Sequence, residues 1–144
     1  MMNRLLIVDD DEDTLLIVTE IARLAGFEPV AASSFTEARD ALKHGVNAVL
    51  LDIVMPDQLC IRLSAYMSEE CPGTPVILMS AGTEAFIDKN RRQLEAVGLT
   101  VTGALIKPFW VDGLLETLSH TLSVPRESGA PEPEALVSGQ RADP

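Results

Sequence analysis

Five polar residues directly follow short apolar runs of the chain, and together their side chains could handle a metal ion and a phosphoryl group. They are Asp9, Asp10, Asp52, Ser80 and Lys107. Carboxylates brought close together repel one another unless a cation lies among them. Oxygen ligands of this kind suit a hard divalent ion that keeps several waters, Mg²⁺ above all. A single Asp or Ser in such a place is often an ordinary turn or cap residue, so the whole set carries the argument.

The chemistry open to this set is phosphoryl transfer. A carboxylate beside Mg²⁺ can act as the nucleophile while the metal and a fixed cation neutralise the phosphoryl oxygens. Asp52 stands alone after a strongly apolar run, so we assign it as the nucleophile, with Asp9 and Asp10 as metal holders. Lys107 would pair with the phosphate, and Ser80 would supply a hydroxyl that moves to meet it.

These residues need a scaffold that brings them together, and the chain indicates a parallel α/β sheet. Short apolar runs alternate with segments of helical periodicity, which is typical of repeated βα units. Strands are expected over residues 4–8, 28–32, 48–51, 75–79 and 102–106. The third and fourth runs are apolar enough for central strands covered on both faces. Sites in such sheets form beyond the carboxyl ends of the strands, where the five polar residues lie.

Five helices are expected between and after these strands. The first would run from about residue 13 to before Gly26, the second would end near Gly45, and the fourth would span about 83–97. Ser34 and Glu37 have capping-box spacing at the start of the second helix. The third, after Pro56, has the least regular apolar pattern. The last shows one apolar stripe at helical spacing, made of Val111, Leu114, Leu115, Leu118 and Leu122.

Length and composition favour one compact domain and exclude several partner classes. The 144 residues carry 22 acidic and 11 basic side chains, a net charge of -11, which argues against nucleic acid or an anionic membrane as the partner. Cys60 and Cys71 lie at no metal-like spacing, which indicates free thiols in a reducing compartment. The early apolar run is too short for a signal peptide or a membrane span. We therefore expect a cytoplasmic protein.

The composition changes near residue 125, where Pro, Glu, Ser, Gly and Ala become frequent. Pro131 and Pro133 forbid a helix through this part of the chain. We expect a domain over residues 1–124, followed by a disordered Pro-rich tail or linker stub over residues 125–144.

Four stretches of the sequence resemble the receiver domain of two-component response regulators, the CheY-like family. They are LLIVDDD at 5–11, AVLLDIVMPD at 48–57, PVILMSA at 75–81 and LIKPF at 105–109. The resemblance covers roughly residues 4–123, and four motifs in the right order make it specific. It implies a three-layer, flavodoxin-like (βα)₅ fold whose five-stranded parallel sheet has the order 2-1-3-4-5.

The resemblance also implies roles for individual residues. Asp52 would accept a phosphoryl group from a histidine of a sensor kinase or phosphotransfer protein, and the phosphorylated chain would act on a downstream protein target. Mg²⁺ would be held by Asp10, Asp52 and the main-chain carbonyl of Val54, with Asp9 assisting through water. Lys107 and Ser80 would take the phosphate-pairing and switch roles, and the Lys107–Pro108 bond would be cis.

The sequence departs from the family pattern in three places. Leu59 and Cys60 replace the usual Asp-Gly, so the turn into the third helix loses its permissive glycine and should be remodelled. Ala104 stands where the family carries an aromatic ring that moves with the switch hydroxyl. The two positions that tune dephosphorylation are Val54 and Gly82, which cannot orient a water molecule, so slow autodephosphorylation is expected.

Three functional hypotheses remain at this point. The first is a phosphorylation-controlled signalling module that catalyses only its own phosphorylation and dephosphorylation and works through protein contacts. The second keeps the receiver but makes it the N-terminal part of a longer regulator with an output domain. The third is a Mg²⁺-dependent aspartyl phosphohydrolase, a class that usually has Asp two residues after the nucleophile and a cap segment. Here Val54 holds that position, and no segment is long enough for a cap.

Overall fold

The computed structural model describes residues 3–108 and 111–123, which form alternating strands and helices. The strands are β1 (Arg4–Val8), β2 (Glu28–Ala32), β3 (Ala48–Asp52), β4 (Pro75–Ser80) and β5 (Thr100–Ile106). The helices are α1 (Glu12–Leu24), α2 (Phe35–His44), α3 (Leu59–Glu70), α4 (Glu84–Ala96) and α5 (Val111–Ser123). All ten predicted elements are present, and only their ends differ from the expected bounds.

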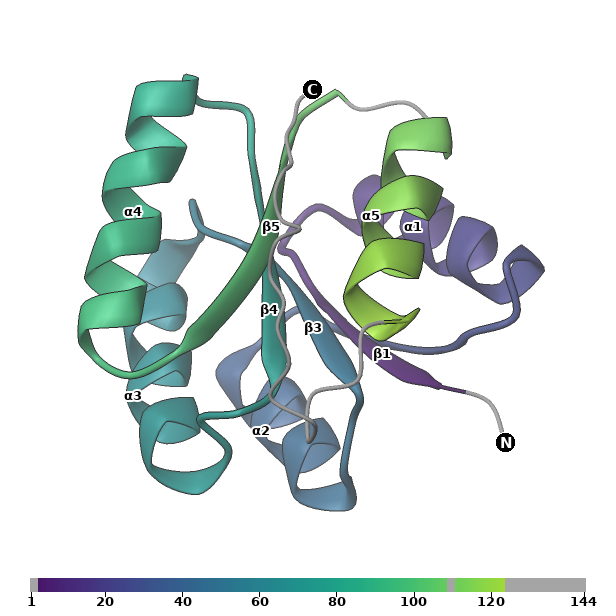
Figure 1. Ribbon diagram of the computed structural model, residues 1–144. Helices are drawn as coiled ribbons and strands as arrows, with labels where there is room; N and C mark the ends of the chain where they lie inside the picture. The colour runs from purple at the N-terminus through teal and green to yellow at the C-terminus, as the bar shows by residue number, and fades with distance from the viewer. Residues whose placement is uncertain (1–2, 109–110, 124–144) are drawn as a thin grey trace.

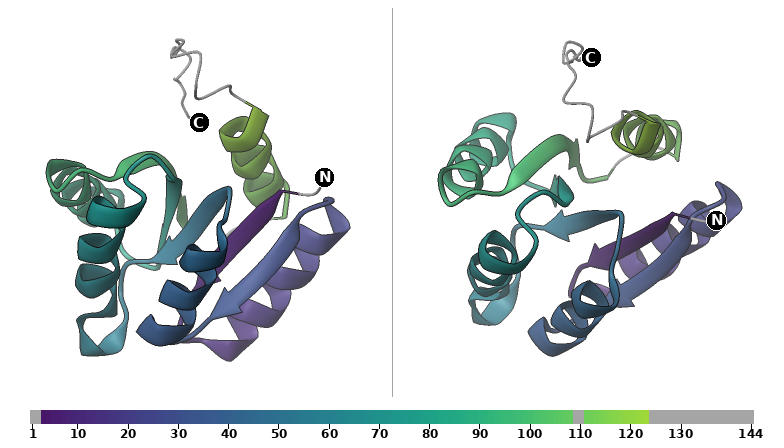
Figure 2. Two further views of the ribbon diagram at one scale, coloured as in Figure 1. Left: turned by 90° about the horizontal axis from the view of Figure 1, so that it is seen from below. Right: turned by 60° about the horizontal axis from the view of Figure 1, so that its bottom comes forward.

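The strands make one parallel sheet in the order β2-β1-β3-β4-β5. Helices α1 and α5 cover one face, and α2, α3 and α4 cover the other (Figures 1 and 2). This is the predicted three-layer arrangement, and the strand order is confirmed.

The side chains of each strand point alternately to the two faces of the sheet, and this divides the core into two halves. Leu6 and Val8 of β1 pack toward α2, α3 and α4, whereas Leu5 and Ile7 pack under α1 and α5. Successive side chains of a strand point to opposite faces, so one apolar run fills both halves. Every residue of β3 and β4 is buried, which confirms their predicted central place.

The ends of two helices refine the sequence-based expectations. Ser34 caps α2 by accepting a hydrogen bond from the Glu37 amide, but the Glu37 carboxylate accepts from the amide of Ser33 rather than that of Ser34. In α5, Leu114 and Leu118 are buried while Val111 is 49% exposed. The buried stripe of α5 therefore begins at Leu114, one turn later than expected.

At the turn between β3 and α3, Leu59 and Cys60 stand where the family pattern has Asp-Gly, and two earlier residues adopt a left-handed backbone. A short 3₁₀ helix, Pro56–Gln58, precedes α3, and α3 itself starts only at Leu59. Asp57 and Gln58 have φ values of 60° and 54°, in the left-handed region. Without glycine each such residue costs roughly 1–2 kcal/mol, so the packing of α3 must offset this strain.

The predicted tail over residues 125–144 lies outside the described residues. The side chain of Leu122, which we placed in the apolar stripe of the last helix, is also outside the description. Within the described residues, none of the helices is long and apolar enough to cross a membrane.

Candidate functional site

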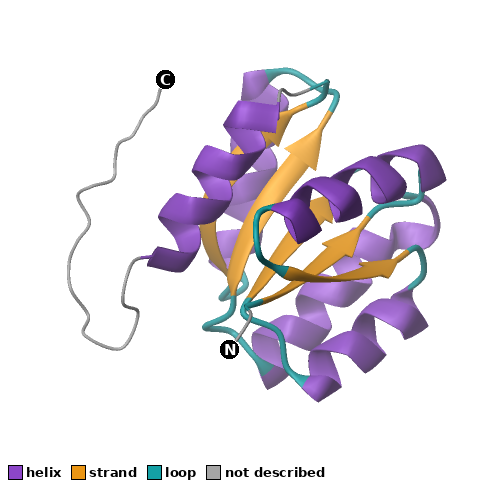
Figure 3. Cartoon of the chain, turned by 90° about the vertical axis from the view of Figure 1, so that its right-hand side faces the viewer, coloured by secondary structure: helices purple, strands orange, loops and turns teal. Residues whose placement is uncertain are grey.

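The predicted polar residues meet at the carboxyl edge of the sheet. Since all five strands run in the same direction, their ends lie at one edge (Figure 3). Asp9 follows β1, Asp52 ends β3, Ser80 ends β4 and Lys107 follows β5. The Lys107 amide donates to the Ser80 carbonyl at 2.7 Å, which ties the last two strand ends together. The predicted convergence is thus present in the fold.

Three carboxylates form a cluster at this edge. Oxygen atoms of Asp9, Asp10 and Asp52 all lie within 4.8 Å of one another. Asp9 is fully buried and Asp52 is 5% exposed, whereas Asp10 is exposed. An all-oxygen set of this kind suits Mg²⁺, which is bound through one or two carboxylates and keeps several waters. The donor chemistry therefore fits the ion that the sequence implied.

Hydrogen bonds divide the three carboxylates by role. Asp9 accepts from the Asp11 amide at 2.9 Å through one oxygen and from Lys107 at 2.6 Å through the other. Both oxygens of Asp9 are engaged, which agrees with an indirect contact to a metal through water. Asp52 accepts from the Val54 amide at 2.9 Å. That amide links Val54 to the site, and the role of its carbonyl stays a prediction.

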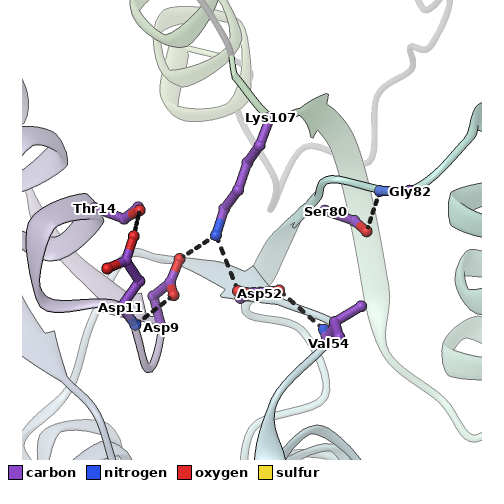
Figure 4. A network of polar contacts seen from close by, with 8 residues as sticks. All are labelled: Asp9, Asp11, Thr14, Asp52, Val54, Ser80, Gly82 and Lys107. Atoms are coloured by element: carbon purple, nitrogen blue, oxygen red, sulfur yellow. Dashed lines mark hydrogen bonds and ion pairs between the residues drawn. The ribbon is translucent and has the colours of Figure 1, made fainter.

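Lys107 bridges two of these carboxylates (Figure 4). Its Nζ lies 2.6 Å from Asp9 Oδ2 and 3.0 Å from Asp52 Oδ2. The bond between Lys107 and Pro108 is cis, as the resemblance implied. The contact with Asp52 agrees with the prediction that Lys107 lies beside this residue, but sequence reasoning missed the contact with Asp9. Only the side-chain geometry reveals that one ammonium serves two acids.

The electrostatics of the site reflect this sharing. Burial raises the pKa of Asp52 and the charge of Asp9 adds to it, against the opposing hydrogen bonds from Val54 and Lys107. Burial alone would lower the pKa of Lys107, but its hydrogen bonds to Asp9 and Asp52 outweigh this and raise it. Two carboxylates stabilise the single positive charge of Lys107, whereas each of these carboxylates must share that charge with the other. The site therefore keeps an excess of negative charge that a divalent cation can meet.

Ser80 does not face Asp52 in this structure. Its buried hydroxyl oxygen accepts a hydrogen bond from the Gly82 amide at 2.9 Å. Figure 4 shows the hydroxyl turned toward Gly82 and away from the carboxylates. A switch role for Ser80 thus requires the side chain to rotate.

Cys60 is a neighbour of the site that sequence reasoning treated as a free thiol and as the replacement for a glycine, but not as part of the site. Burial raises the pKa of its thiol from 9.0 to about 11, and the negative charge of Asp52 adds to this. Near neutral pH a shift of this size makes the reactive thiolate roughly 100-fold scarcer.

We expect Cys60 to be alkylated by iodoacetamide about 100-fold more slowly in the folded protein than in the urea-unfolded chain at about pH 8. The rate should rise with pH until about 11, because only the thiolate reacts. Peptide mapping of samples taken over time separates Cys60 from Cys71. A folded-state profile with its midpoint near 9.0 would contradict the burial of this thiol.

Comparison with known proteins decides the family. Residues 5–119 match the family described as the response regulator receiver domain. The chain belongs to this family. It is 29% identical to the chemotaxis protein CheY of Bacillus subtilis over 126 residues, which cover 85% of this chain and all of CheY. It is 31% identical to the transcriptional regulatory protein CpxR of Escherichia coli over 80 residues, or 56% of this chain.

Solved receiver structures have the same fold. CheY4 of Vibrio cholerae superimposes with a TM-score of 0.71 at 26% identity, over 85% of this chain and 100% of CheY4. A CheY-like receiver domain protein of Methanospirillum hungatei gives 0.76 at 25% identity, over 90% and 100% of the two chains. The matched part of this chain spans only about a third of CpxR, 34% of its length.

The receiver domain family places this chain among signalling proteins rather than metabolic enzymes. Response regulators are also the class to which its relatives belong, so the first two hypotheses fit the family and the third does not.

Proposed function

We propose that this receiver domain takes a phosphoryl group onto Asp52 and thereby switches its protein contacts. The observation that carries the proposal is the place of Asp52 at the end of β3, where it is nearly buried, 3.0 Å from the Lys107 ammonium and within 4.8 Å of Asp9 and Asp10. A nucleophile, a fixed cation and the acids for a metal are then in one place.

The reaction follows from these contacts. A carboxylate oxygen of Asp52 attacks the phosphorus of a phosphohistidine, an O–P bond forms, the N–P bond breaks and the electron pair stays on the imidazole. Asp10, Asp52 and the Val54 carbonyl would hold Mg²⁺, with Asp9 assisting through water, and the ion would supply charge neutralisation of the phosphoryl oxygens. Lys107 stays beside Asp52 and pairs with the new phosphate. Ser80 rotates to donate its hydroxyl hydrogen to it.

A protein donor fits the surroundings of Asp52. A recess next to Lys107 is lined mainly by apolar atoms, from Thr14, Ile17, Val18, Ala81, Lys107 and Pro108. On α1, Leu16 and Ile17 are 71% and 60% exposed. Such apolar surface suits a packed protein contact. We therefore propose a sensor histidine kinase or a phosphotransfer protein as the donor, a protein as the downstream target, and the cytoplasm as the compartment. Nucleic acid and membrane are not expected as direct partners.

Intact-mass measurement with acetyl phosphate tests this function. With Mg²⁺ present, we expect the chain to gain one phosphoryl group, and with a chelator we expect no gain. The same samples, assayed for turnover of small phosphomonoesters, should show none. Catalytic turnover of such esters without a stable phosphoprotein would instead indicate the aspartyl phosphohydrolase.

The relatives support one further point about context. CpxR and the regulator ZraR of Salmonella typhimurium are both much longer than the region matched, which is 34% and 30% of their lengths. We retain as a proposal that this receiver acts as the N-terminal regulatory part of a longer protein with an output domain.

The phosphorylated form should lose its phosphate slowly. Val54 is 57% exposed next to Asp52, and an isopropyl group cannot orient an attacking water. We expect Val54→Asn to speed the loss of phosphate about tenfold by positioning that water. The decay of the phosphoprotein mass after removal of the donor measures this, with Val97→Asn, a change of a similarly exposed valine at the C-terminal end of α4, as the control. Loss within seconds in the unaltered chain would contradict the prediction.

A further inference from the structure

A chain of contacts leads from Ser80 at the site to the first turn of α4. The Ser80 hydroxyl accepts from the Gly82 amide at 2.9 Å, and the side chain of Phe86 lies directly on the Gly82 backbone (Figure 4 shows the first of these contacts). A Cβ placed on Gly82 would be 2.8 Å from one ring carbon of Phe86 and 3.3 Å from another. No side chain fits between them, so the ring and this backbone must move together.

Phe86 is also placed where it can move without disturbing the core. It is 40% exposed, while the adjacent Ile87 is buried and anchors α4. The Phe86 amide donates to the side chain of Thr83, which caps the helix. The ring therefore lies between the loop that is hydrogen-bonded to Ser80 and the solvent-facing surface of α4.

Strand β5 has no aromatic ring at the position where the family carries one that moves with the switch hydroxyl. Ala104 lies there, opposite Leu78 of β4, and its methyl group only borders the core. In the described residues of α4, β5 and the loop 81–83, Phe86 is the aromatic side chain that contacts the loop after Ser80.

We propose that Phe86 transmits the state of Asp52 to the α4 surface; this inference rests on the function proposed above. When the Ser80 hydroxyl rotates toward a phosphoryl group on Asp52, the Gly82 amide loses its acceptor. The loop then rearranges to satisfy that amide, and the Phe86 ring in contact with it changes position and exposure. Phe86 is a positioning residue that acts through Gly82 and Ser80.

Coupling of this kind is reciprocal, so Phe86 must also affect binding at the site. The ring packs against the resting form of the loop and stabilises it. Phe86→Ala should remove that stabilisation and tighten the binding of beryllofluoride with Mg²⁺, a mimic of the phosphoryl group, by roughly fivefold. Gly82→Ala should displace the ring even in the free protein, because the new Cβ would collide with it.

Fluorine NMR of the full chain labelled with para-fluorophenylalanine tests the proposal. The chain has four phenylalanines, and Phe86→Leu and Phe35→Leu assign the signals of these two among them. Phe35, which begins α2 beneath Arg62, is the matched control. Occupancy of the site is followed independently by the amide signal of Val54, which donates to Asp52. On addition of Mg²⁺ and beryllofluoride we expect the Phe86 signal to shift in step with that of Val54, and the Phe35 signal to stay.

The outcomes separate this inference from the proposed function. The inference alone would be overturned by two results together. The Val54 amide would respond while the Phe86 signal stays in place, and the beryllofluoride affinity would be unchanged in Phe86→Ala or in the milder Phe86→Leu. No response at Val54 would overturn the proposed function and the inference with it. Phe35→Leu should bind beryllofluoride as the unaltered chain does. An equal gain in beryllofluoride affinity in Phe35→Leu and Phe86→Leu would show a general loosening of the fold and would overturn the role of Phe86.

Discussion

Asp52→Asn should reduce phosphoryl uptake from acetyl phosphate and Mg²⁺ by at least about a thousandfold. A neutral amide oxygen is a far weaker nucleophile toward phosphorus than a carboxylate oxygen, and it is a weaker ligand for the metal. The fold should survive, since the amide has the same shape and Lys107 still pairs with buried Asp9 at 2.6 Å. The amount of phosphoprotein formed over time, measured by intact mass, gives the ratio.

The matched control for this change is Asp57→Asn. Asp57 is an exposed carboxylate in the loop that follows Asp52, and it belongs to none of the contacts at the site. We expect this variant to take up phosphate at the rate of the unaltered chain. Uptake by Asp52→Asn at that same rate would reject Asp52 as the acceptor.

Lys107→Ala should produce two separate effects, the first of them on stability. Asp9 is fully buried, and loss of its ammonium partner leaves an uncompensated charge that costs about 3 kcal/mol of unfolding free energy. Urea unfolding measures this loss, and Mg²⁺ should restore part of it because it brings positive charge to the same carboxylates. Lys89→Ala, a change of an exposed lysine on α4, should stay within about 0.5 kcal/mol of the unaltered protein.

The second effect of Lys107→Ala concerns signalling. Mg²⁺ binding should be largely kept, because the oxygens of the acidic cluster remain. The phosphate on Asp52 would lack its cation, so phosphorylation should no longer change the conformation of the loop over residues 80–82. Amide NMR spectra with and without beryllofluoride report this response. A loop that responds as fully in Lys107→Ala as in the unaltered chain would remove the proposed role of the lysine.

The convergence of the site could be predicted from the sequence because it depends on topology. Asp9, Asp52 and Lys107 each come directly after an apolar run, and parallel strands bring such residues to one edge whatever their side-chain angles are. The same logic predicted that β3 and β4 are central, since their residues are apolar without alternation. In both cases backbone direction and apolar pattern are sufficient.

Other features depended on side-chain geometry or on strain, which no sequence pattern reports. The ammonium of Lys107 reaches Asp9 as well as Asp52, and the hydroxyl of Ser80 turns to Gly82 rather than to the carboxylates. The left-handed conformations of Asp57 and Gln58 were also hidden, because glycine is the usual signal for such a backbone and neither is glycine.

The most direct test of the account is to locate the phosphoryl group itself. An aspartyl phosphate formed with acetyl phosphate and Mg²⁺ can be reduced by borohydride to homoserine, which peptide mass mapping then places in the chain. The account predicts homoserine at position 52, with Asp9 and Asp10 left unmodified. Homoserine at another aspartate, with Asp52 intact in the phosphorylated chain, would contradict it.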